Sequence, residues 1–312
     1  MLVAIVLAVS ACSDATNQAA RQQNVQWGLQ VQNSRQGPIA PQLRTDNTIL
    51  NHPATVTGMD QDWSCASGYG AWNFDKWMTG SLAKGLTPMI AWEPGDGCSP
   101  AINVARIVSG AYDSYIHSWA RGAARLRGKP TIYLRLMHEP NITAYPWGYQ
   151  HLSGAQYDAA WKHVYHIFRA QGATNVKFVW NFAGDVNNTA ADMRAYYPGD
   201  QYVDYVGWDQ YQNNDVRLDY KSAQTIAPSK PIALGEVGGT DNGYGGYQAL
   251  RDLMDGLAAG SFPAIKEVTY FDVDVGGGVN GDFTLANNPN MAAFIRSALA
   301  GPASRGRVRW GH

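Results

Sequence analysis

Two glutamates of this chain each follow a short apolar run. Glu139 comes after residues 132–138, and Glu236 comes after residues 232–235. If both runs are strands that end at one edge of a sheet, the two carboxyl groups face each other across a cleft. A protonated carboxyl that donates to a leaving oxygen, beside an ionised one that attacks the anomeric carbon or activates water, cleaves a glycosidic bond. The alternative for each glutamate is structural, as a helix cap or as a partner of Arg135.

Polar and aromatic residues also follow the other apolar runs. These ends read Met59-Asp60, Trp92-Glu93-Pro94, His138-Glu139-Pro140-Asn141, Trp180-Asn181, Asp209-Gln210-Tyr211, Gly235-Glu236 and Asp272. The chain has 11 Trp and 17 Tyr against 8 Phe, and the first two combine an apolar face with a polar edge, which suits a wet cleft. We therefore expect Trp92, Trp147, Trp180 and Trp208 to stack on sugar rings, although a core role for Trp208 is equally good.

The elements that must position these residues alternate along the chain. Strands are predicted at Val25–Leu29, Thr55–Met59, Thr87–Trp92, Thr131–Met137, Val176–Asn181, Val203–Trp208, Pro231–Leu234 and Glu267–Asp272, with helical patterns such as 102–126 and 154–171 between them. Several runs are continuous and β-branched, which is typical of parallel strands buried on both faces. The pattern predicts an α/β fold, a single (β/α)8 TIM barrel over 25–300, with catalytic loops at the carboxyl ends of its strands. A doubly wound open sheet is the alternative.

Composition narrows the possible partners. Of the 312 residues, 45% are hydrophobic and 16% are charged, against about 25% charged in ordinary soluble domains. Lys and Arg number 24 and Asp and Glu number 25, so no net field attracts nucleic acid or anionic lipid. We expect a polysaccharide or oligosaccharide substrate, no nucleic acid, and a monomer.

The N-terminus predicts export. Residues 1–11 are apolar, too few to span a bilayer, and they fit a secretory signal peptide. The ending Val9-Ser10-Ala11-Cys12 resembles the lipobox of bacterial lipoproteins, which implies lipidation of Cys12 and a polar tether over 12–24. No Lys or Arg precedes the apolar run, and an ordinary cleaved signal is the alternative. The expected location is extracytoplasmic, either secreted or anchored to the bacterial cell envelope by this lipid alone.

Two further features follow from export and composition. An exported protein meets an oxidising compartment, so Cys65 and Cys98, in loops after the second and third strands, are expected to form a disulfide; two free thiols are the alternative. The tail 301–312 is rich in Gly and Arg and is expected to be flexible.

The chain resembles glycoside hydrolase family 26, a member of the retaining β-glycanase clan built on the β/α barrel. The resemblance spans roughly residues 86–275. It rests on Trp92-Glu93-Pro94, Arg135-x-x-His138-Glu139-x-Asn141, Tyr145-Pro146-Trp147-Gly148, Tyr197-Pro198-Gly199-Asp200 before Val203-Asp204, Asp209-x-Tyr211 and Gly235-Glu236.

The resemblance implies a role for each matching residue. Glu139 would be the general acid/base and Glu236 the nucleophile. Arg135 would support the ionised carboxylate, and Tyr211 would donate a hydrogen bond to it. His138 would contact the sugar near the scissile bond. The remaining substrate-binding candidates are Trp92 and Trp147 as sugar platforms, with Glu93, Asn141, Trp180 and Asp209.

The sequence departs from the family pattern in two places. Ile142, Thr143 and Ala144 stand where the family usually has Gly, a polar residue and a Trp beside the cleavage point. Tyr270 and Phe271 stand near the position where strand eight often presents a Trp. Both departures concern the subsites that select the sugar.

The resemblance implies an exported retaining endo-β-glycanase that needs no cofactor and no metal. β-1,4-mannan or mixed-linkage β-glucan is the expected substrate, and β-1,3-xylan is an alternative. Two other classes stay open: a carbohydrate-binding barrel without turnover and a metal-dependent hydrolase. Two motifs are set aside. His163 and His166 lack a third ligand, and the G-x-G-x-x-G match at 276–281 opens no helix, so it is expected to be a loop.

Overall fold

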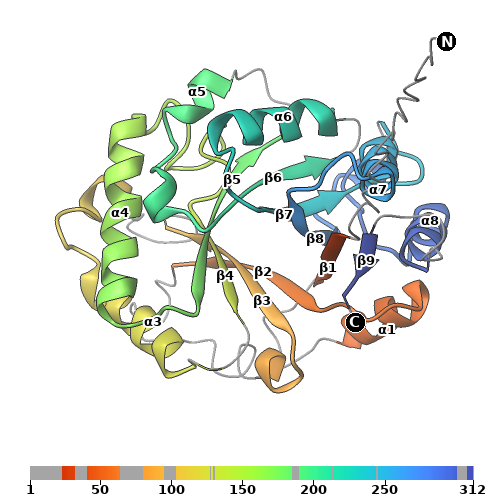
Figure 1. The fold of residues 1–312 in the computed structure, drawn as a ribbon, viewed down its shortest axis with the longest axis horizontal. Helices are drawn as coiled ribbons and strands as arrows, with labels where there is room; N and C mark the ends of the chain where they lie inside the picture. Colours follow the sequence, from red (N-terminus) through yellow and green to blue (C-terminus); the bar gives the residue numbers. More distant parts are fainter. Residues whose placement is uncertain are drawn as a thin grey trace, which may run out of the picture.

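Eight parallel strands close into a barrel (Figure 1). They are β1 (Gln23–Val31), β2 (Val56–Asp62), β3 (Thr87–Glu93), β4 (Ile132–Leu136), β5 (Val176–Ala183), β6 (Tyr205–Tyr211), β7 (Ile232–Gly238) and β8 (Ile265–Asp272). Each strand pairs with the next, and β1 pairs with both β2 and β8, which closes the ring. The predicted TIM barrel is confirmed, and all eight predicted strands are present.

The computed structural model describes residues 23–31, 41–63, 80–94, 103–126, 128, 131–184, 190–211, 214–243, 245–300 and 308–311. Cys12, Cys65 and Cys98 lie outside these residues, as does the predicted signal peptide, so the lipidation and the disulfide stay predictions. Among the described helices, none is both long and apolar enough to cross a membrane.

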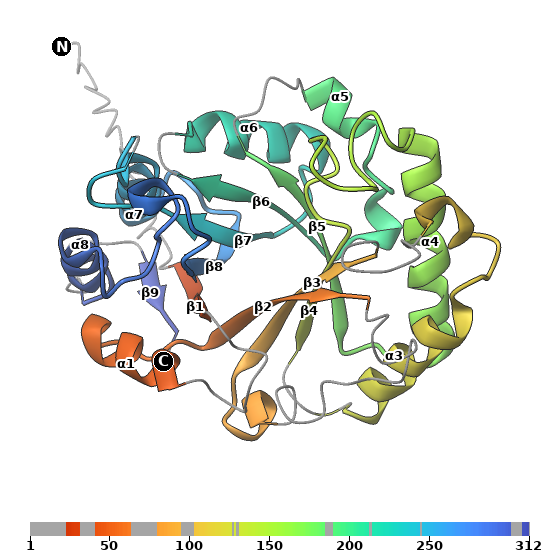
Figure 2. The same ribbon diagram turned by 180° about the vertical axis from the view of Figure 1, so that it is seen from behind.

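Helices surround the strands on the outside of the barrel (Figure 2). They are α1 (Pro41–Leu50), α3 (Asp113–Arg125), α4 (Gly154–Ala170), α5 (Ala190–Arg194), α6 (Val216–Ile226), α7 (Gln248–Ala259) and α8 (Pro289–Leu299), with short 3-10 turns η2 (Val104–Arg106), η3 (Asp200–Tyr202) and η4 (Gly278–Asn280). The helix predicted over 102–126 begins only at Asp113. Gly110 adopts a φ of 78° before it, a left-handed conformation that interrupts the helix.

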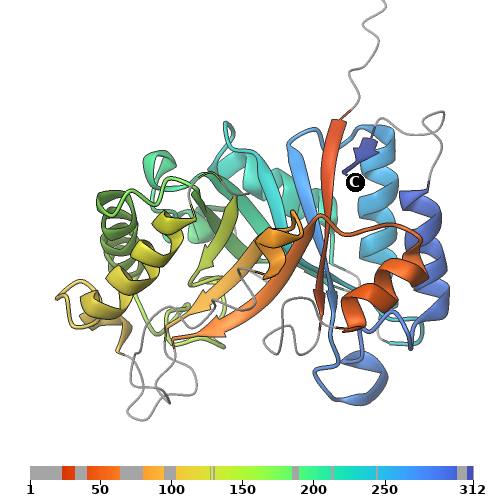
Figure 3. The ribbon, with the colours of Figure 1, turned by 90° about the horizontal axis from the view of Figure 1, so that it is seen from below.

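Two apolar layers form the core. The larger lies between the strands and the helices, and it includes the outward side chains of Trp92, Trp180 and Trp208. A smaller cluster fills the inside of the barrel near the amino ends of the strands, where Met89 and Tyr133 pack with neighbouring inward residues. Because successive side chains of a strand face opposite sides, the polar residues at the carboxyl ends are left to line the mouth. In Figure 3 the loop between β8 and α8 extends beyond this end of the barrel.

The C-terminal tail corrects a prediction. Residues Val308–Trp310 form β9, which pairs in parallel with Gln23–Val25 at the start of β1. The Trp310 ring packs edge-on against Trp27 with centroids 6.0 Å apart. The expectation of a flexible tail is therefore wrong for 308–310, while 301–307 lie outside the described residues. The same pairing explains why β1 begins at Gln23, inside the segment predicted to be a tether.

Candidate active site

A buried arginine organises the barrel mouth. Arg135 points inward from β4, and its side chain is completely buried. One guanidinium nitrogen donates to both carboxylate oxygens of Asp209, at 2.8 and 2.6 Å, and the other donates to Glu236 Oε1 at 2.7 Å. Gly235 makes room for this side chain, because a Cβ there would lie 2.2 Å from Arg135 Nε. Arg135 thus fixes two carboxylates from β6 and β7 around one positive charge.

Glu236 is held in its ionised form. The pairing of β7 with β8 shifts register between Leu234 and Val237, an irregularity of the kind that re-aims a side chain. Tyr211 Oη donates to Glu236 Oε2 at 2.5 Å. Although burial favours the neutral form, the charge of Arg135 and the hydrogen bonds from Tyr211 and Arg135 hold the pKa of Glu236 below its usual value. The hydrogen bond implied for Tyr211 is therefore present.

Glu139 lies just beyond β4 on a constrained backbone. Met137 and Glu139 have φ values of 48° and 50°, a left-handed conformation that non-glycine residues adopt mainly where the surroundings enforce it. The surroundings do so here: Met137 N donates to Trp92 O at 3.2 Å, and Glu139 N donates to Asn181 O at 2.7 Å. Burial, and then the negative charge of Glu236, raise the pKa of Glu139 to about 7. The pKa values of the two glutamates are therefore shifted in opposite directions, so that Glu139 keeps a proton at a pH where Glu236 is ionised.

His138 lies between a tyrosine hydroxyl and a carboxyl group, and its ring is neutral. Its Nε2 is 3.1 Å from Tyr145 Oη, and its Nδ1 is 3.6 Å from Glu93 Oε1. Burial and the charge of Arg135 lower the pKa of His138 to about 3, so the ring is neutral. Burial and the nearby carboxylates of β2 raise the pKa of Glu93 to about 10, so this carboxyl is protonated.

Comparison with known proteins agrees with this geometry. The family model described as Glycosyl hydrolase family 26 matches residues 106–265, which include both glutamates. The chain belongs to glycosyl hydrolase family 26.

Endoglucanase H of Acetivibrio thermocellus is 29% identical over 233 residues, which are 69% of this chain and 24% of that protein. A mannan endo-1,4-beta-mannosidase of Bifidobacterium adolescentis is 29% identical over 112 residues, or 34% of this chain and 11% of that protein. The chain thus spans about a quarter of the first relative's length and matches less of the second.

Solved structures share the fold of this family 26 chain. GH26A from a Muricauda species has a TM-score of 0.65 at 19% identity, with 93% of this chain and 92% of that chain covered. A Cellulomonas fimi endo-beta-1,4-mannanase double mutant has a TM-score of 0.69 at 18% identity, with 94% of this chain and 76% of that chain covered.

The structure corrects the stacking role expected of three tryptophans. Trp92, Trp180 and Trp208 are completely buried and face the helices. Trp92, for example, packs against Trp119 of α3 with ring centroids 4.7 Å apart and edge-on to Phe168 of α4 at 5.8 Å. No face of these indoles is available to a sugar. The reason is the alternation of a strand, in which the residue next to an inward polar side chain faces outward.

Trp147 and Asn141 support the loop after β4. Trp147 is also completely buried. Its Nε1 donates to His138 O at 2.6 Å, and its ring stacks on Tyr145 with centroids 4.7 Å apart. Asn141 Nδ2 donates to Ala183 O and its Oδ1 accepts from Ala183 N, at 2.9 and 2.8 Å. Both side chains tie the loop that carries Glu139 to its neighbours, which corrects the expectation that Trp147 is a platform and gives Asn141 a bracing role.

Two aromatic residues at the mouth were assigned no individual role from the sequence, although Tyr145 lies in a matching motif and Phe271 stands near the Trp position of strand eight. Tyr145 is half-buried and hydrogen-bonds to Glu139. Phe271 shares the inward face of β8 with Glu267 and Thr269, and its ring contacts those of Tyr211 and Phe283, with centroids 5.8 and 5.9 Å apart. Tyr270, the other candidate near this position, is completely buried. Alternate residues of a strand face the same side. Phe271 therefore faces inward like Glu267, four residues earlier, whereas Tyr270 faces outward.

Among the described residues, one group has the ligand types and spacing that could hold a metal ion, and it already pairs with an arginine. Ligand atoms of His138, Asp209 and Glu236 lie within 4.8 Å of one another. The Arg135 guanidinium donates to both carboxylates of this set, so the charge that would attract a metal is already paired. His163, which the sequence placed near His166, instead bonds Asp113 through Nε2 at 2.6 Å.

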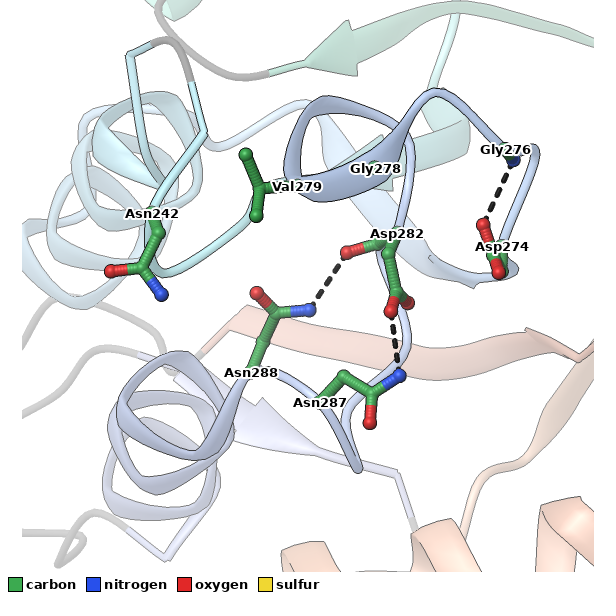
Figure 4. A pocket seen from close by; sticks show the side chains of 8 residues that line it. All are labelled: Asn242, Asp274, Gly276, Gly278, Val279, Asp282, Asn287 and Asn288. Atoms are coloured by element: carbon green, nitrogen blue, oxygen red, sulfur yellow. Dashed lines mark hydrogen bonds between the residues drawn. The ribbon is translucent and has the colours of Figure 1, made fainter.

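A polar cavity of about 360 Å³ lies between the β7–α7 and β8–α8 loops (Figure 4). Asn288 Nδ2 donates to Asp282 O at 2.8 Å, and Asn287 Nδ2 donates to Asp282 Oδ2 at 2.6 Å. Neither Glu139 nor Glu236 lines it. The side-chain amides of Asn287 and Asn288 thus form hydrogen bonds within the β8–α8 loop. Gly276, Gly277 and Gly278 all have positive φ, so the glycine motif forms a turn. The expectation that this motif is a loop is confirmed.

Proposed function

We propose that this chain is a retaining endo-β-glycanase that hydrolyses a β-linked polysaccharide by double displacement. The observation that carries the proposal is that two glutamates in one barrel mouth have pKa values shifted in opposite directions. Burial and the charge of Glu236 raise the pKa of Glu139 to about 7, while Arg135 and Tyr211 keep Glu236 ionised. Glycosidic cleavage requires one carboxyl of each kind, whether it retains or inverts the anomeric configuration, and our choice of retention rests on the membership of the chain in glycosyl hydrolase family 26.

Each residue then has a step to perform. Glu236 attacks the anomeric carbon while Glu139 gives its proton to the departing glycosidic oxygen, which leaves a glycosyl ester on Glu236. Glu139, now ionised, takes a proton from a water molecule, and the resulting hydroxide displaces Glu236 from the sugar. Arg135 and Tyr211 donate hydrogen bonds that stabilise the Glu236 carboxylate whenever it is not bonded to the sugar.

β-1,4-mannan and mixed-linkage β-glucan are the substrates that we favour. The names of the two relatives, an endoglucanase and a mannan endo-1,4-beta-mannosidase, support this choice. β-1,3-xylan is the alternative, because Ile142, Thr143 and Ala144 replace the residues usual beside the cleavage point.

A polysaccharide panel tests the proposal. The purified full chain is incubated with β-1,4-mannan, mixed-linkage β-glucan and β-1,3-xylan, and reducing ends and product lengths are measured over time. Endo action predicts a mixture of oligosaccharides before any monosaccharide, with the Glu236→Gln variant as the control. Polysaccharide binding without new reducing ends would favour the carbohydrate-binding alternative. Activity that a chelator abolishes would favour the metal-dependent one.

We also propose that the protein is exported and lipidated on Cys12. The apolar residues 1–11 and the lipobox-like Val9–Cys12 support this proposal. Expression in a bacterial host with a labelled fatty acid should label the wild type and not Cys12→Ala. For the proposed Cys65–Cys98 disulfide, alkylation of the denatured, unreduced protein should leave both thiols unlabelled.

A further inference from the structure

Three aromatic rings pack together beside Glu236. Tyr211 ends β6, Phe271 lies near the end of β8, and Phe283 belongs to the loop between β8 and α8. The centroid of the Tyr211 ring lies 5.8 Å from that of Phe271 and 5.2 Å from that of Phe283, and the two phenylalanine centroids lie 5.9 Å apart. Aromatic rings attract each other at such distances. The ring of Tyr211 is therefore held partly by a residue that comes from a loop.

The Tyr211 ring also lies directly against the backbone of β7. Gly238 pairs with Tyr211 in the β6–β7 register. A Cβ on Gly238 would lie 2.6 Å from Tyr211 Cε1 and 3.1 Å from Phe283 Cδ1, so a glycine is needed for both rings to approach the strand here. Because the two rings and the strand meet at one point, the Tyr211 ring has little room to move.

Hydrogen bonds of the β8–α8 loop hold Phe283 in this place. Phe283 N donates to Val273 O at 3.1 Å, and Phe283 O accepts from Tyr270 Oη at 2.6 Å. The preceding residue is fixed as well, because Asp282 Oδ2 accepts from Asn287 Nδ2 at 2.6 Å (Figure 4). The loop therefore presents Phe283 from a defined backbone.

We propose that Phe283 is a positioning residue for Glu236 and acts through Tyr211. By confining the Tyr211 ring against Gly238, it keeps the phenol hydroxyl where it donates to Glu236 Oε2, at 2.5 Å. This hydrogen bond stabilises the ionised carboxylate, which is the form that attacks the sugar. The proposal rests on the proposed function of Glu236, and it connects the β8–α8 loop with the reaction.

Other titratable groups also face Glu236. They come from β3, β4, the loop after β4 and β6, and they are Glu93, Arg135, His138, Glu139 and Asp209. Phe283 carries no charge, so its substitution alters none of these groups. A smaller side chain could admit water to Glu236, but that effect would not depend on the Tyr211 hydroxyl.

The pKa of Glu236 can be measured directly by carbon NMR. The chain contains four glutamates, so labelling the glutamate carboxyl groups with ¹³C gives four signals, and the signal of Glu236 is assigned by its absence in Glu236→Gln. In Phe283→Leu the Tyr211 ring gains freedom, so the pKa of Glu236 should rise toward its usual value. This measurement needs no substrate, so its outcome does not depend on whether the chain proves to be a glycanase.

A double-mutant cycle shows whether Phe283 acts through Tyr211. Tyr211→Phe removes the hydroxyl and should raise the pKa of Glu236 by itself, and the addition of Phe283→Leu should then raise it no further. With a polysaccharide substrate, Phe283→Leu alone should lower kcat about 2–10-fold, the range expected for one aromatic pair. The acid limb of kcat/KM should move to higher pH, and both effects should vanish in the Tyr211→Phe background.

Phe262→Leu is the matched control. Phe262 packs on Tyr220 with centroids 5.0 Å apart and an interplanar angle of 50°, close to the 5.2 Å and 53° of Phe283 on Tyr211. It precedes β8 and so lies at the end of the barrel opposite the mouth. This variant should lower the melting temperature and leave the pKa of Glu236 unchanged.

A second variant tests the same contact if Phe283→Leu does not fold. Gly238→Ala adds a Cβ that must displace the Tyr211 ring, so it should also raise the pKa of Glu236. Thermal melting confirms that each variant is folded. A wild-type pKa of Glu236 in either folded variant, or an equal rise in the Tyr211→Phe background, would refute the role of Phe283.

Discussion

At the carboxyl ends of β3 and β6, neighbouring residues face opposite sides of the barrel wall. Trp92 and Trp208 point outward and are completely buried in the layer between strands and helices. Glu93 and Asp209 are also buried but point into the mouth, where they contact His138 and Arg135. One step along the chain separates a packing residue from a residue of the site.

The two faces differ in how they stabilise the molecule. The outer face removes large aromatic rings from water, and it buries the indole nitrogens of Trp92 and Trp180 without a hydrogen-bond partner among the described residues. The inner face instead gathers carboxylates around Arg135, an arrangement that sets pKa values more than it stabilises the fold. Substitutions on the two faces should therefore have opposite signatures.

The largest expected effect is on the inner face. Glu139→Gln removes the proton donor without changing the size of the side chain. Turnover of polysaccharide should fall about 10²–10⁴-fold, while the free energy of unfolding at pH 5, where Glu139 is neutral, should barely change. Initial rates and denaturant unfolding measure the two quantities. A loss of stability that accounts for the loss of activity would place Glu139 with the packing residues.

Trp92→Ala should show the reverse signature. Deleting the buried indole should lower the free energy of unfolding by about 3–5 kcal/mol, while KM of the folded fraction stays near that of the wild type. Urea titration and kinetics well below the melting temperature test this, with Trp208→Ala as the matched variant on β6. A raised KM with unchanged stability would restore Trp92 as a sugar platform.

The pH dependence of kcat/KM tests the pKa values of the two glutamates on the inner face. The acid/base works in its protonated form, so kcat/KM should fall about tenfold per pH unit above a pH of about 7, where Glu139 loses its proton. Because the pKa of Glu236 is lowered, the acid limb should lie below the usual range of a glutamate. An aryl glycoside whose phenol leaves without a proton should show no limb near pH 7. The same limb on both substrates would assign it to another group.

The smallest expected effect concerns Trp147, whose buried ring packs in the core while its Nε1 donates to the backbone of His138 in the mouth. Trp147→Phe keeps the stack on Tyr145 but removes the bond from Nε1 to His138 O. Stability should fall by about 1 kcal/mol, with a decrease of a few-fold in kcat. A large rise in KM at unchanged stability would show instead that this ring meets the substrate.

The sequence predicts the barrel and the glutamate pair because both depend on local patterns. The continuous apolar runs locate all eight strands, and a parallel barrel brings their carboxyl ends to one face. Glu139 and Glu236 are then among the carboxylates that follow strand ends, and the resemblance to family 26 assigns their roles.

The orientation of each side chain at those ends could not be predicted in the same way. A strand buried on both faces shows no polar alternation, so TPMIAWE does not reveal whether Trp92 or Glu93 faces inward. The register shift in β7 that accompanies Glu236, and the pairing of β9 with β1, depend on segments distant in the chain. The tryptophans were assigned wrongly because the sequence alone does not show which residues of such a strand face inward.

The central claim is that Glu139 and Glu236 perform different tasks, and azide rescue tests it most directly. With an aryl glycoside that needs no acid, Glu139→Ala should still form the glycosyl-enzyme, and azide should speed its turnover to a β-glycosyl azide. Glu236→Ala cannot form that intermediate, so it should be inactive alone, and azide should yield only the α-glycosyl azide. An α-azide from Glu139→Ala and a β-azide from Glu236→Ala would show that the two roles are exchanged.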